Sequence, residues 1–204
     1  MTAADVKQAE EALIELDPKL GEVIIRQRPL APRDRGGYFE SLCRSIIGQQ
    51  VSVASASAIY GRLAVVTSLD PINVAALDEA AMKTIGLSRQ KLSYLVDLAV
   101  HFVDQPDIYD HLETSGDDEA IDELTAIKGI GVWTAQMFLM FTLGRADVFA
   151  PDDVGLQNAM KRLYGWEVLP KKAELTEFAL RWAPHRTTAS LHLWASLNNA
   201  PNIT

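Results

Sequence analysis

Cysteine is almost absent from this chain, since Cys43 is the only one among its 204 residues. A single cysteine excludes an intramolecular disulfide, a zinc site made of several cysteines and a four-cysteine iron–sulfur cluster. Cys43 lies in an apolar helical pattern, where a lone cysteine is typically a packing residue rather than a nucleophile.

Long apolar runs are absent as well, and no stretch reaches the length that is needed to span a bilayer. The first residues, Met1–Glu11, lack the basic region followed by an apolar one that marks a secretory signal. We therefore expect an intracellular protein that is not secreted.

Basic residues are few, because 19 Lys and Arg stand against 27 Asp and Glu, for a net charge of −8. This balance argues against a protein that coats nucleic acid without specificity, since positive charge drives such binding. It still allows an enzyme that contacts phosphates through backbone amides. Acidic residues cluster around Ser115–Glu123, whereas basic residues gather at Arg89, Lys91, Lys161 and Arg162.

Sustained strand alternation is also missing, and the chain predicts an all-α fold with short loops. Apolar residues recur at helical spacing, as at Phe39, Leu42 and Ile46. The segment Met137–Phe141 is apolar on every side, which predicts a buried helix. Residues suited to accept hydrogen bonds from helix N-terminal amides predict helix starts at Ser52, Asp70, Ser88 and Asp152.

The most distinctive segment is Leu124–Ala135, in which Gly129-Ile130-Gly131 separates two helical patterns. We expect the glycines to supply positive φ and to let a phosphate approach bare backbone amides at the start of the second helix. Carbonyls on the other side of such a hairpin could hold a monovalent cation. From this pattern alone, an ordinary helix–loop–helix corner is an equal alternative.

Two acids, Asp152 and Asp153, follow Pro151 at the start of the next helical pattern. We expect Asp152 to cap that helix, so that Asp153 in the first turn points into a cleft and is available for chemistry. The alternative is that both acids only cap the helix.

Three motifs together resemble the helix-hairpin-helix DNA glycosylase superfamily, in particular the DNA-3-methyladenine glycosylases that repair alkylated bases. They are Leu124–Gln157 with its hairpin, Trp-Thr-Ala and Pro-Asp-Asp, then Tyr38–Ser52 with Gly-Gln-Gln-Val-Ser, and finally Ile85–Ala99. The resemblance covers roughly residues 37 to 200. It implies a compact form without the N-terminal β domain of larger members.

The fold that this resemblance implies is all-α and two-lobed, with the active site in the cleft between the lobes. One lobe is a helical barrel of residues 37–148, which contains the helix-hairpin-helix at about 118–144. Residues 1–36 and 149–204 form the second lobe, which carries the catalytic aspartate.

Trp133 narrows the subclass, because lyase-active relatives place a catalytic lysine at this position of the hairpin motif. A tryptophan cannot form a Schiff base. The resemblance therefore implies a monofunctional enzyme that hydrolyses the bond between sugar and base and leaves an abasic site. A cationic alkylated purine of the 3-methyladenine or 7-methylguanine class would stack well on an aromatic ring.

The resemblance also implies a role for individual residues. Asp153 is the catalytic acid, and it would stabilise the sugar oxocarbenium ion or activate water. The base pocket would comprise Trp133, Met137 and Trp194, although core packing is an equal alternative for Trp194. In the duplex the inserted wedge would be Gln50, with Gln49 beside it; the alternative for this loop is a plain helix junction capped by Ser52. DNA backbone contacts are expected from Gly129, Gly131, Lys128, Thr134, Ser88 and Lys91. A solvated side chain is an equal alternative for Lys91 and is also an alternative for Lys128. The backbone carbonyls of Thr125, Ile127 and Gly129 would hold Na⁺ or K⁺ when DNA is bound.

The expected partner is double-stranded DNA with alkylated bases, bound by a monomer without a membrane or a required cofactor. The expected location is the cytoplasm, at the nucleoid, in a bacterium, or the nucleus in a eukaryote. Two rival functions remain. One is a glycosylase for oxidised or deaminated bases, and the other is a non-catalytic helix-hairpin-helix DNA-binding module.

Overall fold

A computed structural model describes residues 1–27, 30 and 36–197 of the chain. All regular secondary structure in these residues is helical, which confirms the predicted all-α fold. No helix in the described ranges is long and apolar enough to cross a membrane. The elements in chain order are α1 (Ala3–Leu16), α2 (Pro18–Gln27), α3 (Tyr38–Gly48), α4 (Val53–Thr67), α5 (Pro71–Ala75), α6 (Glu79–Ile85), α7 (Arg89–Asp104), η1 (Asp110–Glu113), α8 (Asp117–Ala126), α9 (Val132–Phe141), α10 (Val154–Tyr164), α11 (Lys172–Ala179), η2 (Leu180–Trp182) and α12 (Arg186–Ser196).

The described residues divide into two compact units, and the division falls inside α9, after Phe138. We call residues 36–138 the hairpin unit, and we call residues 1–27, 30 and 139–197 the terminal unit. The sequence predicts that the lobes divide between residues 36 and 37 and again after Val148. The second division comes earlier in the structure, after Phe138. Part of the predicted second lobe, residues 28–29, 31–35 and 198–204, lies outside the described residues.

The segment after α9 belongs to the terminal unit because it bonds to the start of α12. The Thr187 hydroxyl donates to the Arg145 carbonyl at 2.7 Å, and the Val148 amide donates to that hydroxyl at 3.1 Å. Asp147 and Arg186 form an ion pair at 2.7 Å beside these bonds. The division after Phe138, rather than after Val148, follows from these contacts.

Side-chain caps begin several helices where the sequence predicts them. The Ser52 hydroxyl accepts a hydrogen bond from the Ser55 amide, and the Ser88 hydroxyl accepts one from the Lys91 amide. Asp70 accepts from two amides of α5, which has proline at its start. These contacts confirm three of the four predicted helix starts, and the fourth is described with the functional site.

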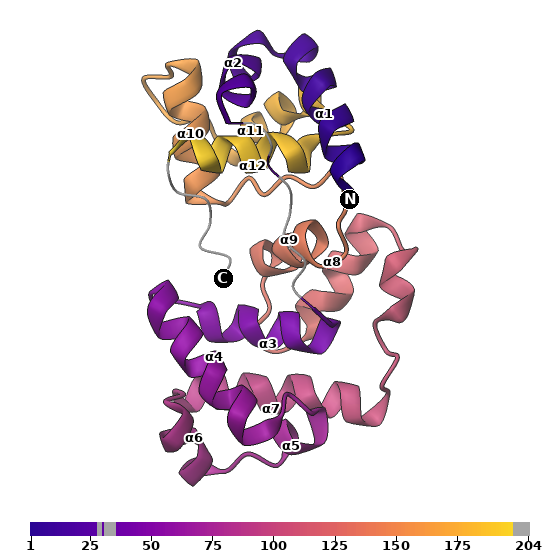
Figure 1. Cartoon of the computed structure of the whole chain (residues 1–204), viewed down its shortest axis with the longest axis vertical. Helices are drawn as coiled ribbons and strands as arrows, with labels where there is room; N and C mark the ends of the chain where they lie inside the picture. Colours follow the sequence, from indigo (N-terminus) through magenta and orange to yellow (C-terminus); the bar gives the residue numbers. More distant parts are fainter. Residues whose placement is uncertain (28–29, 31–35, 198–204) are drawn as a thin grey trace. The chain divides into compact units, whose positions relative to one another are not determined.

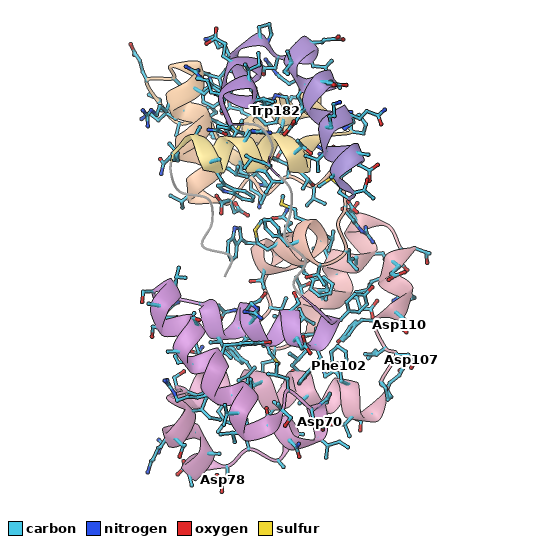
Figure 2. All side chains as sticks on the ribbon, viewed as in Figure 1. Asp70, Asp78, Phe102, Asp107, Asp110 and Trp182 are labelled. Carbon is cyan, nitrogen blue, oxygen red and sulfur yellow. The ribbon has the colours of Figure 1, made fainter. Side chains whose placement is uncertain are left out.

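The core of the hairpin unit forms where α7 packs against α3 and α5. Leu42 of α3 and Leu98 of α7 are fully buried. Phe102, labelled in Figure 2, makes an edge-to-face contact with Phe39 at a ring-centre distance of 5.2 Å. Cys43 is buried in this core and burial raises the pKa of its thiol, so its expected packing role is confirmed.

In the terminal unit, α12 packs against α1, α2 and α10 (Figure 1). Trp182 of η2 lies among these helices (Figure 2) and is fully buried. Its indole N–H donates to Oδ2 of Asp17 at 3.0 Å, and the Tyr164 hydroxyl donates to the same oxygen at 2.7 Å. The buried Asp17 carboxylate thus joins the start of α2 to the end of α10 and to η2.

The charge state of Asp17 follows from these bonds. Burial by itself raises the pKa of the carboxyl, but the bonds from Tyr164 and Trp182, with one from the Leu20 amide, outweigh it and hold the pKa below its ordinary value of 3.8. A carboxylate with a lowered pKa in the folded state stabilises the fold above the unfolded-state pKa. This contribution is lost as the pH falls through the folded-state pKa.

We predict that Asp17→Asn lowers the free energy of unfolding by about 2 kcal/mol at pH 7, because two buried donors lose a charged acceptor. The gap between wild type and variant should narrow as the pH falls below about 4. Urea unfolding at pH 7 and pH 3, followed by circular dichroism, measures both effects. Glu15→Gln, which changes an exposed carboxylate of α1, serves as the control. A gap that stays constant across this pH range would contradict the assignment.

Candidate functional site

The hairpin lies between α8, which ends at Ala126, and α9, which begins at Val132. Gly129 in its turn has φ +87°, a conformation that residues with a Cβ rarely adopt. A Cβ there would also lie 2.2 Å from Cδ2 of Tyr94. Glycine at this position is therefore required both by the backbone conformation and by the close approach of the Tyr94 ring.

Gly131 differs from Gly129, and the expectation that both glycines supply positive φ is wrong for it. A Cβ at Gly131 would meet nothing within 4 Å, and the residue is exposed. The first intrahelical bond of α9 runs from the Ala135 amide to the Gly131 carbonyl at 2.9 Å. The amides of Gly131 and Val132 therefore precede that bond, at the end of the helix that favours an anion.

The hairpin turn is held against α7 through Lys128. The Lys128 amide donates to Oδ2 of Asp97 at 3.1 Å, and its ammonium donates to the Ser93 hydroxyl at 3.1 Å. Lys128 is exposed, so the predicted phosphate contact requires its side chain to leave Ser93 or to share it. The turn itself is fixed in place by α7 before any ligand arrives.

Two of the three predicted cation ligands already accept hydrogen bonds. The Ile127 carbonyl accepts from the Ile130 amide at 3.0 Å, and the Gly129 carbonyl accepts from Nε2 of Gln49 at 2.8 Å. A carbonyl oxygen has two lone pairs, so each of these retains one. Neutral oxygen donors suit a hard monovalent ion, and the donor set, with Thr125, fits the expected Na⁺ or K⁺.

The beginning of α9 contributes the predicted aromatic residue of the base pocket. The Trp133 side chain is 41% exposed at the helix start, whereas Met137, one turn further, is 3% exposed. Thr134, expected at the DNA backbone, is buried. The roles of these three residues stay predictions, and only Trp133 presents a substantial surface.

The loop between α3 and α4 carries the predicted wedge. Gln50 is exposed and has φ +57°, the left-handed conformation that a non-glycine residue rarely adopts. Gln49 is half-buried, and its side chain reaches the hairpin at the Gly129 carbonyl. The structure thus joins the wedge loop to the hairpin within one unit through Gln49, and it leaves the adjacent Gln50 exposed.

Lys91 lies in the first turn of α7, after the capping residue Ser88. Its ammonium donates to the carbonyls of Ile47 and Gln49, each at 2.7 Å. Burial lowers the pKa of the Lys91 amine. Both Ser88 and Lys91 are expected at the DNA backbone; in this structure each bonds to the protein's own backbone, and the expected DNA contacts stay predictions.

Asp153 is the N-cap of α10, and the prediction that Asp152 caps this helix is wrong. Oδ1 of Asp153 accepts from the Leu156 amide at 2.7 Å. The helix begins at Val154, so the residue just before it is in position to cap. Asp152 lies one residue earlier, where it forms an exposed ion pair with Lys172.

Trp194 fixes the same carboxylate from α12. Its indole N–H donates to Oδ1 of Asp153 at 2.8 Å, and its ring stacks on Phe141 at a ring-centre distance of 6.0 Å. The Trp194 side chain is 1% exposed. This placement agrees with core packing, the alternative that the sequence left open, and adds a contact to the predicted catalytic acid.

Gly155 is a site residue that the sequence did not reveal. A Cβ at Gly155 would lie 3.0 Å from Oδ1 of Asp153 and 3.1 Å from Cδ1 of Trp194. The missing side chain therefore makes room for the bond between the two. Glycine in the first turn of a helix, two residues after an acid, was the available signal, because it disfavours the helix unless something packs closely against it.

The predicted site residues fall into two groups. Asp153 and Trp194 meet in the terminal unit, together with Gly155 and Phe141. The hairpin, the wedge loop and Trp133 belong to the hairpin unit. Hydrogen bonds join Asp153 to Trp194 in the first group and the wedge loop to the hairpin in the second.

These features have counterparts in a known class of proteins. A sequence model described as "HhH-GPD superfamily base excision DNA repair protein" matches residues 43–185, which is more than half of the chain. The protein belongs to this family. The match extends from the middle of α3 through the hairpin and Asp153 to the start of α12.

Relatives within the family narrow the class. DNA-3-methyladenine glycosylase 1 of Schizosaccharomyces pombe is 29% identical over 86% of this chain and 79% of its own. A DNA-3-methyladenine glycosidase structure from Bacillus halodurans has a TM-score of 0.82 at 35% identity, covering 92% of this chain and 88% of that one. The S. pombe enzyme Mag1 in complex with abasic DNA has a TM-score of 0.80 at 29% identity, covering 94% and 97%. These likenesses confirm the predicted resemblance to the DNA-3-methyladenine glycosylases.

We predict that Gly129→Ala lowers the free energy of unfolding by about 2 kcal/mol or more, because it adds left-handed strain to a clash with Tyr94. The double variant Gly129→Ala/Tyr94→Ala should regain the part due to the clash, relative to Tyr94→Ala alone. Gly131→Ala, two residues away, should change stability by less than about 0.5 kcal/mol. Urea unfolding measures the free energy of unfolding of these four variants and of the wild type. Equal destabilisation by Gly129→Ala and Gly131→Ala would contradict this description of the turn.

Proposed function

We propose that this protein is a monofunctional DNA glycosylase that excises alkylated bases of the 3-methyladenine and 7-methylguanine class from duplex DNA as a monomer. The product is an abasic site, as in base excision repair. The observation that carries the proposal is the buried Asp153 carboxylate, fixed on one side by the start of α10 and on the other by Trp194. The names of the relatives support the choice of substrate.

The proposed chemistry breaks the bond between C1′ of the sugar and the ring nitrogen of the base. In a nucleotide such as N3-methyladenine the base carries a positive charge, so it leaves with the bonding electron pair as a neutral molecule. The sugar becomes an oxocarbenium ion, which the negative charge of Asp153 stabilises. Water then adds to C1′ and gives up a proton to Asp153 or to solvent.

The residues around Asp153 hold its carboxylate in a fixed position before the substrate binds. Two donors, the Leu156 amide and the Trp194 indole, hold Oδ1 at 2.7 and 2.8 Å. A carboxylate held in this way needs little reorganisation as positive charge develops on the sugar. Trp194 is therefore proposed to position the acid, and Trp133 to provide the aromatic surface for the base.

Base extrusion precedes the chemistry, since a stacked base is out of reach. We propose that Gln50 fills the space that the base leaves, while Trp133 stacks on the extruded cation, a contact worth about 2 kcal/mol when it is desolvated. Amides of Gly131 and Val132 would bind a DNA phosphate at the start of α9. A monovalent cation at the Gly129 carbonyl would add positive charge beside that phosphate.

We predict that Asp153→Asn reduces excision at least about a hundredfold while DNA binding is retained. Asparagine keeps an oxygen that can cap α10 and accept from Trp194, so this variant removes the charge with little change in the fold. The measurement is release of free base from methylated duplex DNA, together with DNA affinity by fluorescence anisotropy. Asp152→Asn, which removes a neighbouring exposed acid, should keep wild-type activity. Full activity in Asp153→Asn would contradict the catalytic assignment.

The same assay on wild type separates the rival functions. Release of oxidised or deaminated bases in preference to methylated ones would favour the first rival. DNA binding without release of any base would favour a non-catalytic module.

We predict that the DNA product contains an abasic site in an intact strand, because Trp133 occupies the position of the lyase lysine. Denaturing electrophoresis should show full-length strands that break only after treatment with hot alkali. Addition of borohydride during the reaction should trap no covalent complex, since no Schiff base forms. A borohydride-trapped protein–DNA adduct would show that another amine, such as that of Lys91 or Lys128, acts as a lyase nucleophile.

A further inference from the structure

The wedge loop, residues 48–52 between α3 and α4, adopts a conformation that local sequence does not favour. Gln50 is left-handed at φ +57° without being glycine, and its side chain is exposed. Such a conformation persists only where the surroundings determine it. Contacts from outside the loop must therefore hold Gln50 in place.

Lys91 provides the first of these contacts. The last carbonyls of α3 have no partner within the helix, and the Lys91 ammonium accommodates two carbonyls there, those of Ile47 and Gln49. These two residues lie on either side of Gly48, directly before Gln50. The Lys91 ammonium is thus directed at the protein's own backbone.

Gln49 provides the second contact. Its side-chain amide donates to the Gly129 carbonyl at 2.8 Å, across 80 residues of sequence. The hairpin is itself held to α7 by the bonds from Lys128 to Asp97 and Ser93. The loop, the hairpin and α7 are thus joined in a closed ring of hydrogen bonds within one unit.

We propose that Lys91 and Gln49 are positioning residues for base extrusion, which hold the Gln50 wedge in register with the phosphate-binding hairpin. This inference rests on the proposed function. A phosphate captured by the hairpin would fix where the DNA backbone lies, and the ring of hydrogen bonds would fix how far from it Gln50 stands. Loss of either contact leaves the acid and the hairpin in place but releases the wedge.

The test compares two duplexes that differ in the free energy needed to extrude the base. Single-turnover excision of 7-methylguanine is measured in a duplex opposite cytosine, and again opposite an abasic site, where the lesion is unpaired and extrusion is easier. Lys91→Met removes both carbonyl contacts, and Gln49→Met removes the contact with the hairpin. Each should slow excision about tenfold or more from the paired duplex, but only about twofold from the unpaired one.

Two further variants identify the cause. Lys91→Arg keeps donors for both carbonyls and should restore the wild-type ratio between the two duplexes. Lys128→Met removes a charge from the hairpin but keeps the Lys128 amide bond to Asp97 and both contacts to the wedge loop, so it should affect both duplexes alike. Thermal melting accompanies each variant, and if Lys91→Met does not fold, the ratio measured for Gln49→Met decides the question.

The outcomes separate this inference from the function on which it rests. If wild type excises the base but Lys91→Met and Gln49→Met slow both duplexes equally, the positioning role is wrong and the proposed function stands. An equal loss that is accompanied by a weaker salt dependence of binding would assign Lys91 to a phosphate instead. If wild type releases no base from either duplex, the proposed function fails and this inference fails with it.

Discussion

Backbone groups at helix ends lack partners within the helix, and an all-α protein must satisfy them by other means. In this chain several of the side chains that do so are ones expected to serve DNA. Asp153 caps α10, and Lys91 donates to a carbonyl at the end of α3. Gln49 donates to the hairpin carbonyl of Gly129. Within each unit, the predicted site residues are therefore held at helix ends.

The fold and the family were predictable because their signals are local. Ser52, Asp70 and Ser88 each cap the helix that follows within a few residues, so neighbouring sequence is sufficient to identify them. The two-glycine hairpin is equally local, and it lies between helices at the expected residues. Even so, the different needs of Gly129 and Gly131 depend on Tyr94, a residue that no pattern near the hairpin indicates.

What the sequence could not provide are side-chain contacts between distant segments. Lys91 reaches Ile47 across 44 positions, and Trp194 reaches Asp153 across 41. The assignment of the cap to Asp152 failed for a different reason, since helix boundaries read from sequence are uncertain by a residue or two and adjacent acids satisfy the same pattern. The shift of one residue places the cap on Asp153, the residue that the proposed chemistry also uses, and leaves Asp152 in an exposed ion pair.

The double bonding of Asp153 has a consequence for evolution. Because one oxygen both begins α10 and receives the Trp194 indole, the folding of the helix and the proposed excision chemistry constrain the same atom. A descendant that no longer excised bases would still be under pressure to keep an aspartate or asparagine here, because either residue can cap the helix. An acceptor oxygen at this position is therefore required by the architecture, whereas only the proposed chemistry requires its negative charge.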